Sequence, residues 1–205
     1  MIRRLYVFAH IVKYKLMRAF YLFLTEWRLK GNNVCYKHYR SVGSPLIENG
    51  MEGEILFGEN LNMNNSQMSS LIGYRTPCIF RTYKGSILVG DNVGMTQTTL
   101  VAIGADVIIG DNVKLGRGVK VFTTDFHSKN YLVRRDARLD MEKRKCANVI
   151  LEEDCFVGSD TIILKGVTVG ARSIIGAGSV VVKDVPPDCL AAGNPCRVIS
   201  DISLA

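Results

Sequence analysis

The sequence has few histidines and no paired cysteines. Its 205 residues contain three histidines, His10, His38 and His127. The six cysteines form no C-x-x-C pair and no cluster with metal-ligand spacing; they are Cys35, Cys78, Cys146, Cys155, Cys189 and Cys196. We therefore expect no metal site, and we interpret the cysteines as free thiols in a reducing cytosol.

No uninterrupted apolar stretch is long enough to cross a bilayer. Lys13 and Lys15 break the apolar run within residues 1–30 far below the roughly 20 residues that a span needs. The segment also lacks a small-residue cleavage site, which argues against a signal peptide. Its apolar residues recur at steps of three or four and predict an amphipathic helix over residues 1–30; they are Leu5, Phe8, Val12, Leu16, Phe23 and Trp27.

Acidic residues are almost missing from this first segment. Residues 1–30 hold seven basic residues and one acidic residue, Glu26, so they carry +6 of the chain's net charge of +7. The nearly neutral remainder argues against a nucleic-acid-binding domain and for a local contact with something anionic or membranous. Two interpretations stay open. The helix packs on the body or on a neighbouring subunit, or it rests on the inner membrane face.

What the sequence does have is a repeat of six residues. From residue 151 an aliphatic residue returns at every sixth place: Leu151, Val157, Ile163, Val169, Ile175 and Val181. Four places after each stands a small or β-branched residue: Cys155, Thr161, Val167, Ser173, Ser179 and Val185. Residues at i and i+4 point to the same face of a strand, and the Gly, Asp and Asn residues between them suit a bend. The repeat predicts a flat-sided solenoid in which six residues form one side of a coil.

The repeat also divides the chain into segments. It is faint from Phe57, clear from residue 89, and interrupted between about His127 and Val149 by a stretch rich in charged residues. We expect a transition at 31–56, a solenoid at 57–199 with an excursion loop at 128–148, and a tail at 200–205.

Three stretches carry a resemblance to a known family. They read IGDNV at 109–113, GVTVGARSIIGAGSVV at 166–181 and KDVPPDCLAAGNPCRVI at 183–199. They resemble the hexapeptide-repeat acyltransferases, above all the galactoside- and maltose-type and the capsule or O-antigen sugar O-acetyltransferases. The resemblance covers about residues 85–199. It implies a left-handed parallel β-helix, assembled as a homotrimer, that uses acetyl-CoA as the acetyl donor.

The resemblance also points to a catalytic histidine. In the family this residue lies at the end of a rung beside an excursion loop, and His127 in TTDFHS occupies that place. An imidazole suits the work, because a hydroxyl near neutral pH needs a base with a pKa close to the working pH. Asp125 is a candidate to orient His127, and the alternative is an aspartate that caps the turn.

The residues that match the family's acetyl-CoA contacts lie in the last coils. They are Ser159, Ala177, Val182, Lys183 and Arg197. A small side chain at Ala177 permits close approach of the pantetheine arm, and Lys183 and Arg197 suit the phosphates. The alternatives are corner packing for Ala177 and ordinary solvated charges for the other two.

The excursion loop, and two places where the chain differs from the family pattern, bear on which molecule accepts the acetyl group. We interpret the basic loop as a lid that shapes a pocket for an anionic or nucleotide-linked sugar, the alternative being a solvated flap. Where galactoside acetyltransferases carry carboxylates, this chain has Ala102, Ile103 and Gly104, which argues against a galactoside. Cys155 stands where many relatives have Trp.

The sequence thus predicts a cytoplasmic, trimeric enzyme that acetylates a sugar hydroxyl. A γ-class carbonic anhydrase is excluded by the single histidine of the repeat region, since its zinc needs three. The remaining alternatives are serine or antibiotic acetylation and a non-catalytic assembly module. The expected partners are a saccharide of surface polysaccharide biosynthesis and a membrane contacted through residues 1–30.

Overall fold

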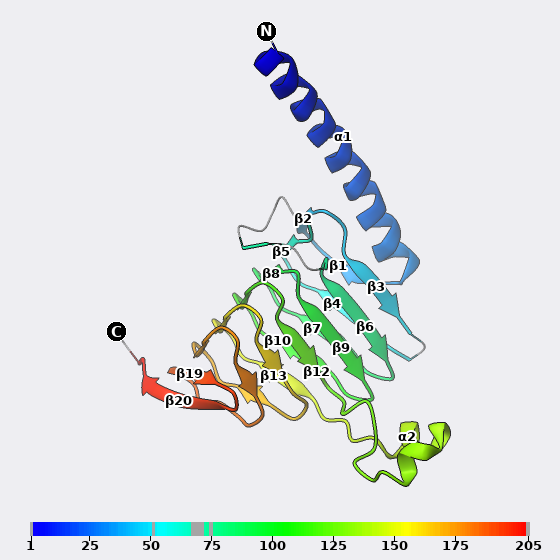
Figure 1. Ribbon diagram of the computed structural model, residues 1–205, viewed down its shortest axis with the longest axis vertical. Coiled ribbons are helices and arrows are strands. Elements are labelled where there is room, and N and C mark those ends of the chain that lie inside the picture. Colours follow the sequence, from blue (N-terminus) through cyan, green and yellow to red (C-terminus); the bar gives the residue numbers. More distant parts are fainter. Residues whose placement is uncertain (1, 51, 67–71, 74–75, 204–205) are drawn as a thin grey trace.

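The chain folds into a coil of short strands with one long helix at its N-terminal end (Figure 1). The computed structural model describes residues 2–50, 52–66, 72–73 and 76–203. Within these residues, eighteen strands follow one another through three parallel sheets in strict rotation, so each coil has three sides. The predicted solenoid is therefore a parallel β-helix.

The strands of each sheet stack in chain order. The first sheet contains β1 (Cys35–Tyr36), β4 (Ile55–Phe57), β7 (Ile87–Val89), β10 (Val107–Ile109), β13 (Val149–Leu151) and β16 (Thr168–Val169). The second contains β2 (Tyr39–Val42), β5 (Leu61–Asn64), β8 (Gly94–Thr96), β11 (Lys114–Leu115), β14 (Phe156–Val157), β17 (Ile174–Ile175), β19 (Cys189–Gly193) and β20 (Cys196–Asp201). The third contains β3 (Leu46–Asn49), β6 (Ile79–Tyr83), β9 (Thr99–Ile103), β12 (Lys120–Phe122), β15 (Ile162–Ile163) and β18 (Val180–Val181).

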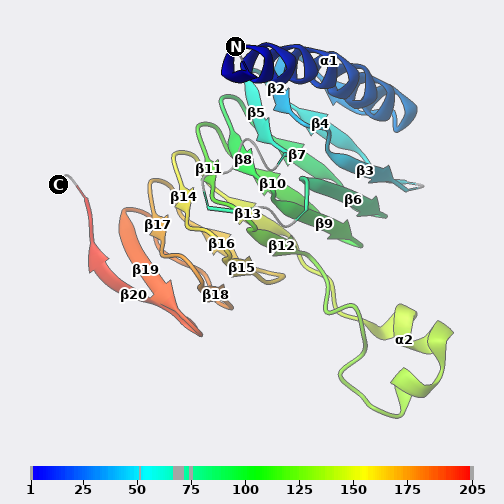
Figure 2. The same ribbon diagram turned by 45° about the horizontal axis from the view of Figure 1, so that its top comes forward.

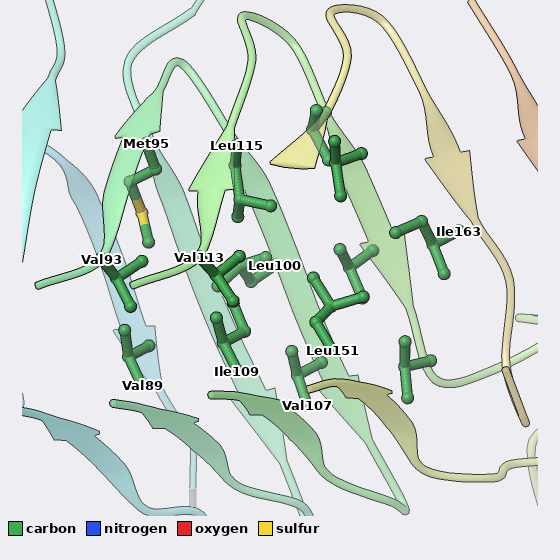
Figure 3. Close-up of a cluster of buried hydrophobic side chains, with 14 of the residues drawn as sticks. Val89, Val93, Met95, Leu100, Val107, Ile109, Val113, Leu115, Leu151 and Ile163 are labelled. Carbon is green, nitrogen blue, oxygen red and sulfur yellow. The ribbon is translucent and has the colours of Figure 1, made fainter. Parts of the chain in front are cut away.

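The six-residue repeat fills the inside of this coil. All six aliphatic positions from Leu151 to Val181 are fully buried, and their small partners from Cys155 to Val185 are buried beside them. Figure 3 shows the side chains of successive coils, among them Val107, Ile109 and Leu151, pointing into the common interior. Large and small residues alternate because three strands converge on a narrow core that must be filled at close-packed density.

The corners are built from residues that tolerate a left-handed backbone. One corner repeats this conformation in coil after coil, with φ between 56° and 61° at these positions: Asn60, Asn92, Asn112, Asp154, Arg172 and Asp188. The side-chain amide of Asn60 donates to Asn92 and that of Asn92 to Asn112, at 3.1 and 3.3 Å. Asparagine and aspartate adopt this conformation more readily than other non-glycine residues, which explains their choice at the bend.

The coil begins earlier than expected. Strands β1, β2 and β3 lie within 31–56, the segment that we expected to be a transition, and they form a complete first turn. This turn lacks the six-residue repeat, yet its strands pair in register with those of the second turn, for example Tyr39 opposite Leu61. At the other end β20 extends to Asp201, into the expected tail 200–205, of which Leu204 and Ala205 lie outside the described residues.

Helix α1 (Ile2–Gly31) matches the helix expected at 1–30, except that Met1 lies outside the described residues. Only its C-terminal third touches the coil, where Thr25 and Leu29 are fully buried. The Tyr36 and Tyr39 hydroxyls donate to the two carboxylate oxygens of Glu26, at 2.7 and 2.6 Å. These contacts attach α1 to the first turn, at the end of the coil that carries β1–β3 (Figures 1 and 2).

Candidate active site

The chain leaves the coil after β12 and returns at β13, and this excursion projects from the side of the coil (Figure 2). Thr124 and Cys146 pair as an antiparallel bridge at its neck. Two further backbone hydrogen bonds cross the neck, from Asp125 N to Lys145 O and from Ala147 N to Thr123 O. The excursion contains the short 3-10 helix η2 (Val133–Arg135) and helix α2 (Ala137–Lys143). It is therefore a folded insertion closed by its own neck.

His127 follows directly after this neck and meets helix α2. Its Nδ1 lies 2.6 Å from Oδ2 of Asp140, and Oδ1 of Asp140 accepts the backbone N–H of Ser128 at 2.6 Å. The Asp140 side chain is 9% exposed, whereas that of His127 is 70% exposed. One carboxylate thus holds both the ring and the backbone beside it, while the ring stays open to solvent.

The charge of Asp140 fixes which nitrogen of the neutral His127 ring carries the proton. The hydrogen bond from His127 lowers the pKa of Asp140 below its ordinary value, and the Ser128 N–H lowers it further. The carboxylate is therefore ionised near neutral pH and can only accept, so Nδ1 of His127 must carry the proton that it donates. In its neutral form the ring therefore presents an unprotonated Nε2, the atom that can serve as a base.

Asp125 does not orient His127, contrary to the expectation. Its Oδ1 lies 2.7 Å from Nζ of Lys165, and the two side chains are 24% and 20% exposed. Phe126, with φ of 63°, turns the chain between Asp125 and His127. Lys165 follows β15, the strand stacked next to β12, so coil stacking brings it to Asp125. The alternative role, a cap of the turn, is not seen either, because the backbone N–H of Phe126 donates to Thr124 Oγ1 at 3.2 Å.

Sequence reasoning missed Asp140. It is one of three acids in the excursion, with Asp136 and Glu142. The other two acids are also engaged locally: Asp136 caps α2 by accepting from Arg138 N and Leu139 N, and Glu142 pairs with Arg138 at 3.3 Å. The sequence does show acidic residues in the excursion as possible partners of His127. Which of them reaches the ring depends on how the loop folds back, and the sequence does not indicate that.

The five residues that we expected to contact acetyl-CoA lie at three places on the chain. Ser159 and Ala177 stack on the corner between the second and third sheets, where Gly178 N donates to Ser159 O at 2.8 Å. Val182 and Lys183 follow β18, at the corner from which the excursion also departs two coils earlier, and Arg197 lies on β20. Ala177, Val182, Lys183 and Arg197 are exposed, and Ser159 is half-buried. Within one chain, the width of the third sheet separates Ser159 and Ala177 from His127. The first two precede strands of this sheet, whereas His127 follows one of them.

The two departures from the family pattern have structural counterparts. Ala102 is fully buried, and a Cβ on Gly104, which has φ of 64°, would meet Sγ of Cys146 at 3.0 Å. The rung before His127 therefore faces the neck of the excursion and offers no carboxylate there. Cys155 lies inside the coil, where its thiol donates to Gly170 O at 3.1 Å and burial raises its pKa to about 11.

The other two histidines lie outside this site. His10 is on the exposed part of α1 and stacks on Tyr6. His38 places Nδ1 2.8 Å from Glu59 on the surface of the first turn, with a side chain 84% exposed. In the described part of the chain, no group of three His, Cys, Asp or Glu residues could hold a metal ion.

Comparisons with known proteins agree with this architecture. The family model described as bacterial transferase hexapeptide (six repeats) matches residues 148–183. The galactoside O-acetyltransferase of Escherichia coli K12 is 30% identical over 183 residues, which are 88% of this chain and 81% of that protein.

Two solved structures are also similar. The hexapeptide-repeat acetyltransferase VCA0836 of Vibrio cholerae is 32% identical, with a TM-score of 0.52 over 60% of this chain and 70% of that one. A maltose O-acetyltransferase of Clostridium difficile 630 is 26% identical, with a TM-score of 0.54 over 91% and 87% of the two chains. This chain therefore belongs to the hexapeptide-repeat acyltransferases, and it is an acetyltransferase.

Proposed function

We propose that this enzyme transfers an acetyl group from acetyl-CoA to a hydroxyl of a saccharide. The observation that carries the proposal is the pair of His127 and Asp140, a solvent-open imidazole held at Nδ1 by a buried carboxylate 2.6 Å away. Such a pair leaves Nε2 free to accept a proton, and acetyl transfer to a hydroxyl needs a base at that point.

The reaction proceeds by direct attack. Nε2 of His127 takes the proton of the acceptor hydroxyl as its oxygen bonds to the thioester carbon. The tetrahedral oxyanion collapses, the carbon–sulfur bond breaks, and the departing thiolate takes the proton back from the imidazolium. Asp140 favours the imidazolium through its negative charge, and a base of this kind contributes about 10²–10⁴ in rate. Among the described residues, no hydrogen bond joins a cysteine to His127, and the thiol of Cys146 at the neck donates to Thr124 Oγ1 at 3.4 Å, so a covalent acyl-enzyme has no support.

For the donor we propose a site shared between subunits. Ser159 and Ala177 lie a full side of the coil away from His127, so a homotrimer of left-handed coils would complete the site with one subunit's corner and its neighbour's excursion. The exposed Ala177 leaves room for the pantetheine arm beside Val182. Lys183 and Arg197, both exposed, would bind the phosphates.

For the acceptor we propose an anionic or nucleotide-linked sugar of surface polysaccharide biosynthesis, acetylated in the cytoplasm. The three acids of the excursion are engaged with Arg138, the end of α2 and His127, while Arg135, Lys143 and Lys145 are exposed. An excess of exposed base in the excursion that follows His127 favours a negatively charged acceptor over a neutral one. The lack of a carboxylate on the preceding rung disfavours a galactoside.

The test measures thiol release from acetyl-CoA with a panel of free, nucleotide-linked and lipid-linked sugars, serine and an aminoglycoside or chloramphenicol-type antibiotic. His127→Ala should lower turnover by about 10²–10⁴, and Ala177→Leu should raise KM for acetyl-CoA. His38→Ala is the matched control, because His38 also contacts a carboxylate at 2.8 Å but lies on the first turn. Unchanged turnover of His127→Ala would remove it from the mechanism, and turnover of serine or the antibiotic alone would replace the saccharide.

A further inference from the structure

Helix α1 is fixed to the coil at one end and free along the rest of its length. Besides the Glu26 contacts, the Arg28 guanidinium donates to Ser44 Oγ at 3.2 Å and to Pro45 O at 2.7 Å. Every residue from Arg3 to Phe20 is exposed. The anchored third therefore sets the direction in which the free two thirds present their side chains, because a continuous helix keeps one face in line.

The apolar stripe of α1 points away from the body. In the anchored third Thr25 and Leu29 are fully buried, whereas Phe23 and Trp27 beside them are 68% and 66% exposed. The same outward face continues along the free part through residues spaced by three or four: Leu5, Phe8, Val12, Leu16 and Phe20. The opposite side of α1 instead borders a cavity of about 570 Å³ that His10, Tyr14 and Tyr21 line together with Tyr39 and Arg40 of the first turn.

The charge of α1 indicates what covers this stripe. No acidic residue precedes Glu26, while the same stretch carries Arg3, Arg4, Lys13, Lys15 and Arg18. Basic residues in the first turn oppose the helix dipole, so helix stability does not explain them. An anionic surface next to the helix would offset this cost and attract every one of these charges.

A second copy of the helix fits less well. Two or more copies of α1 side by side would repel one another through their positive charges. The free part of the helix contains no acidic residue that could pair with the basic residues of another copy. The stripe also spans more than the narrow seam of a coiled coil, because Phe8 and Phe20 widen it on either side of Leu5, Val12 and Leu16. Lys13 and Lys15 fall at its two edges, as in helices that lie flat in a membrane interface.

We propose that α1 docks the enzyme on an anionic phospholipid surface, with the outward apolar stripe inserted at the boundary between headgroups and acyl chains. No described helix has the length and apolarity to cross a bilayer, so the contact is peripheral. The fixed anchor makes the coil stand behind the helix in one orientation. The contact is independent of the acetyl-transfer chemistry.

The test is flotation of the full chain with vesicles. We expect binding to an equimolar mixture of phosphatidylcholine and phosphatidylglycerol, weakened by added salt, and little binding to phosphatidylcholine alone. Leu16→Glu with Phe23→Glu should reduce binding by more than about tenfold, because it places charge on the inserted face. Lys13→Gln with Lys15→Gln should reduce it by about fivefold for each charge removed.

Val7→Glu is the matched control. Val7 is 47% exposed and lies nine residues from Leu16, about two and a half turns away and so on the opposite face. Thiol release with a soluble acceptor shows that each variant is folded, independently of lipid. Active protein that fails to float with the mixed vesicles, or equal losses from Val7→Glu and the stripe variant, would overturn the proposal. So would a stripe variant whose oligomeric mass changes while its vesicle binding does not.

Discussion

Nδ1 of His127 and Oδ2 of Asp140 lie 2.6 Å apart although the two residues are thirteen positions apart in the chain. The contact exists because the excursion folds back through η2 and α2 and returns Asp140 to the neck from which His127 departs. The pair is therefore a product of the insertion alone and does not use the stacking of the coil.

Replacing Asp140 by Asn should lower kcat by about tenfold or more and leave KM for acetyl-CoA unchanged. The amide cannot offset the charge of the imidazolium, and the loss should stay below that of His127→Ala. The control is Asp136→Ala, which removes the cap of the same helix without touching His127 and costs about 1 kcal/mol of stability. Equal losses of kcat in both variants would reduce Asp140 to a structural role.

The ion pair of Asp125 and Lys165 should stabilise the root of the excursion. We expect Asp125→Asn and Lys165→Met each to lower the free energy of unfolding, because each leaves a partly buried charge or polar group without its partner. The double variant should lose less than the sum of the two, with a coupling of about 1 kcal/mol in a double-mutant cycle. A kcat of Asp125→Asn as low as that of Asp140→Asn would restore Asp125 as the residue that orients His127.

Two glycines should separate close approach from backbone conformation. A Cβ at Gly158 would lie 2.5 Å from Ala177 N in the next coil, whereas a Cβ at Gly178 meets nothing within 4 Å but sits on a backbone with φ of 72°. Gly178→Ala should cost about 1 kcal/mol of unfolding free energy. Gly158→Ala should cost about 2 kcal/mol or more, because two coils must move apart. Urea unfolding checks both, and the reverse order would contradict the close stacking at this corner.

The anchor of α1 should depend on pH through Glu26. Hydrogen bonds from Tyr39 and then Tyr36 lower the pKa of Glu26 below its ordinary value of 4.5. A carboxyl whose pKa is lowered on folding contributes stability that is present above its unfolded pKa and is lost as pH falls through the folded value. We therefore compare the urea midpoint of unfolding at about pH 6 with that at about pH 3.5. The midpoint should decrease between these two pH values in both proteins, and it should decrease less in Glu26→Gln than in the wild type. An identical fall in both would show that other carboxylates account for it.

The solenoid could be predicted because its signal is local and repeated. Leu151, Val157 and Ile163 are spaced by one side of the coil, and each carries its small partner four residues later, so the sequence alone indicates which side chains meet. The first turn could not be found in this way. Its strands β2 and β3 hold Arg40 and Glu48 among few aliphatic residues, and their register comes from pairing with β5 and β6.

The candidate site was predictable only in part. The position of His127 follows from where the repeat breaks, but Asp140 depends on a fold-back inside the break that no periodicity records. The contact of Lys165 with Asp125 could have been predicted, because the register of β12 and β15 places the two residues one coil apart. The stripe on α1 was visible in the sequence, whereas its outward direction is set by the tyrosine contacts of Glu26.

Strand β20 reverses the direction of every strand before it and pairs antiparallel with β19. A stack of parallel strands ends in unpaired backbone groups, and a further chain could add to them and grow a fibre. The returning strand occupies that position on the second sheet with exposed polar residues such as Arg197, Ser200 and Asp201. The last hairpin therefore ends the parallel repeat of this sheet, so a further parallel coil would meet a strand that runs in the opposite direction.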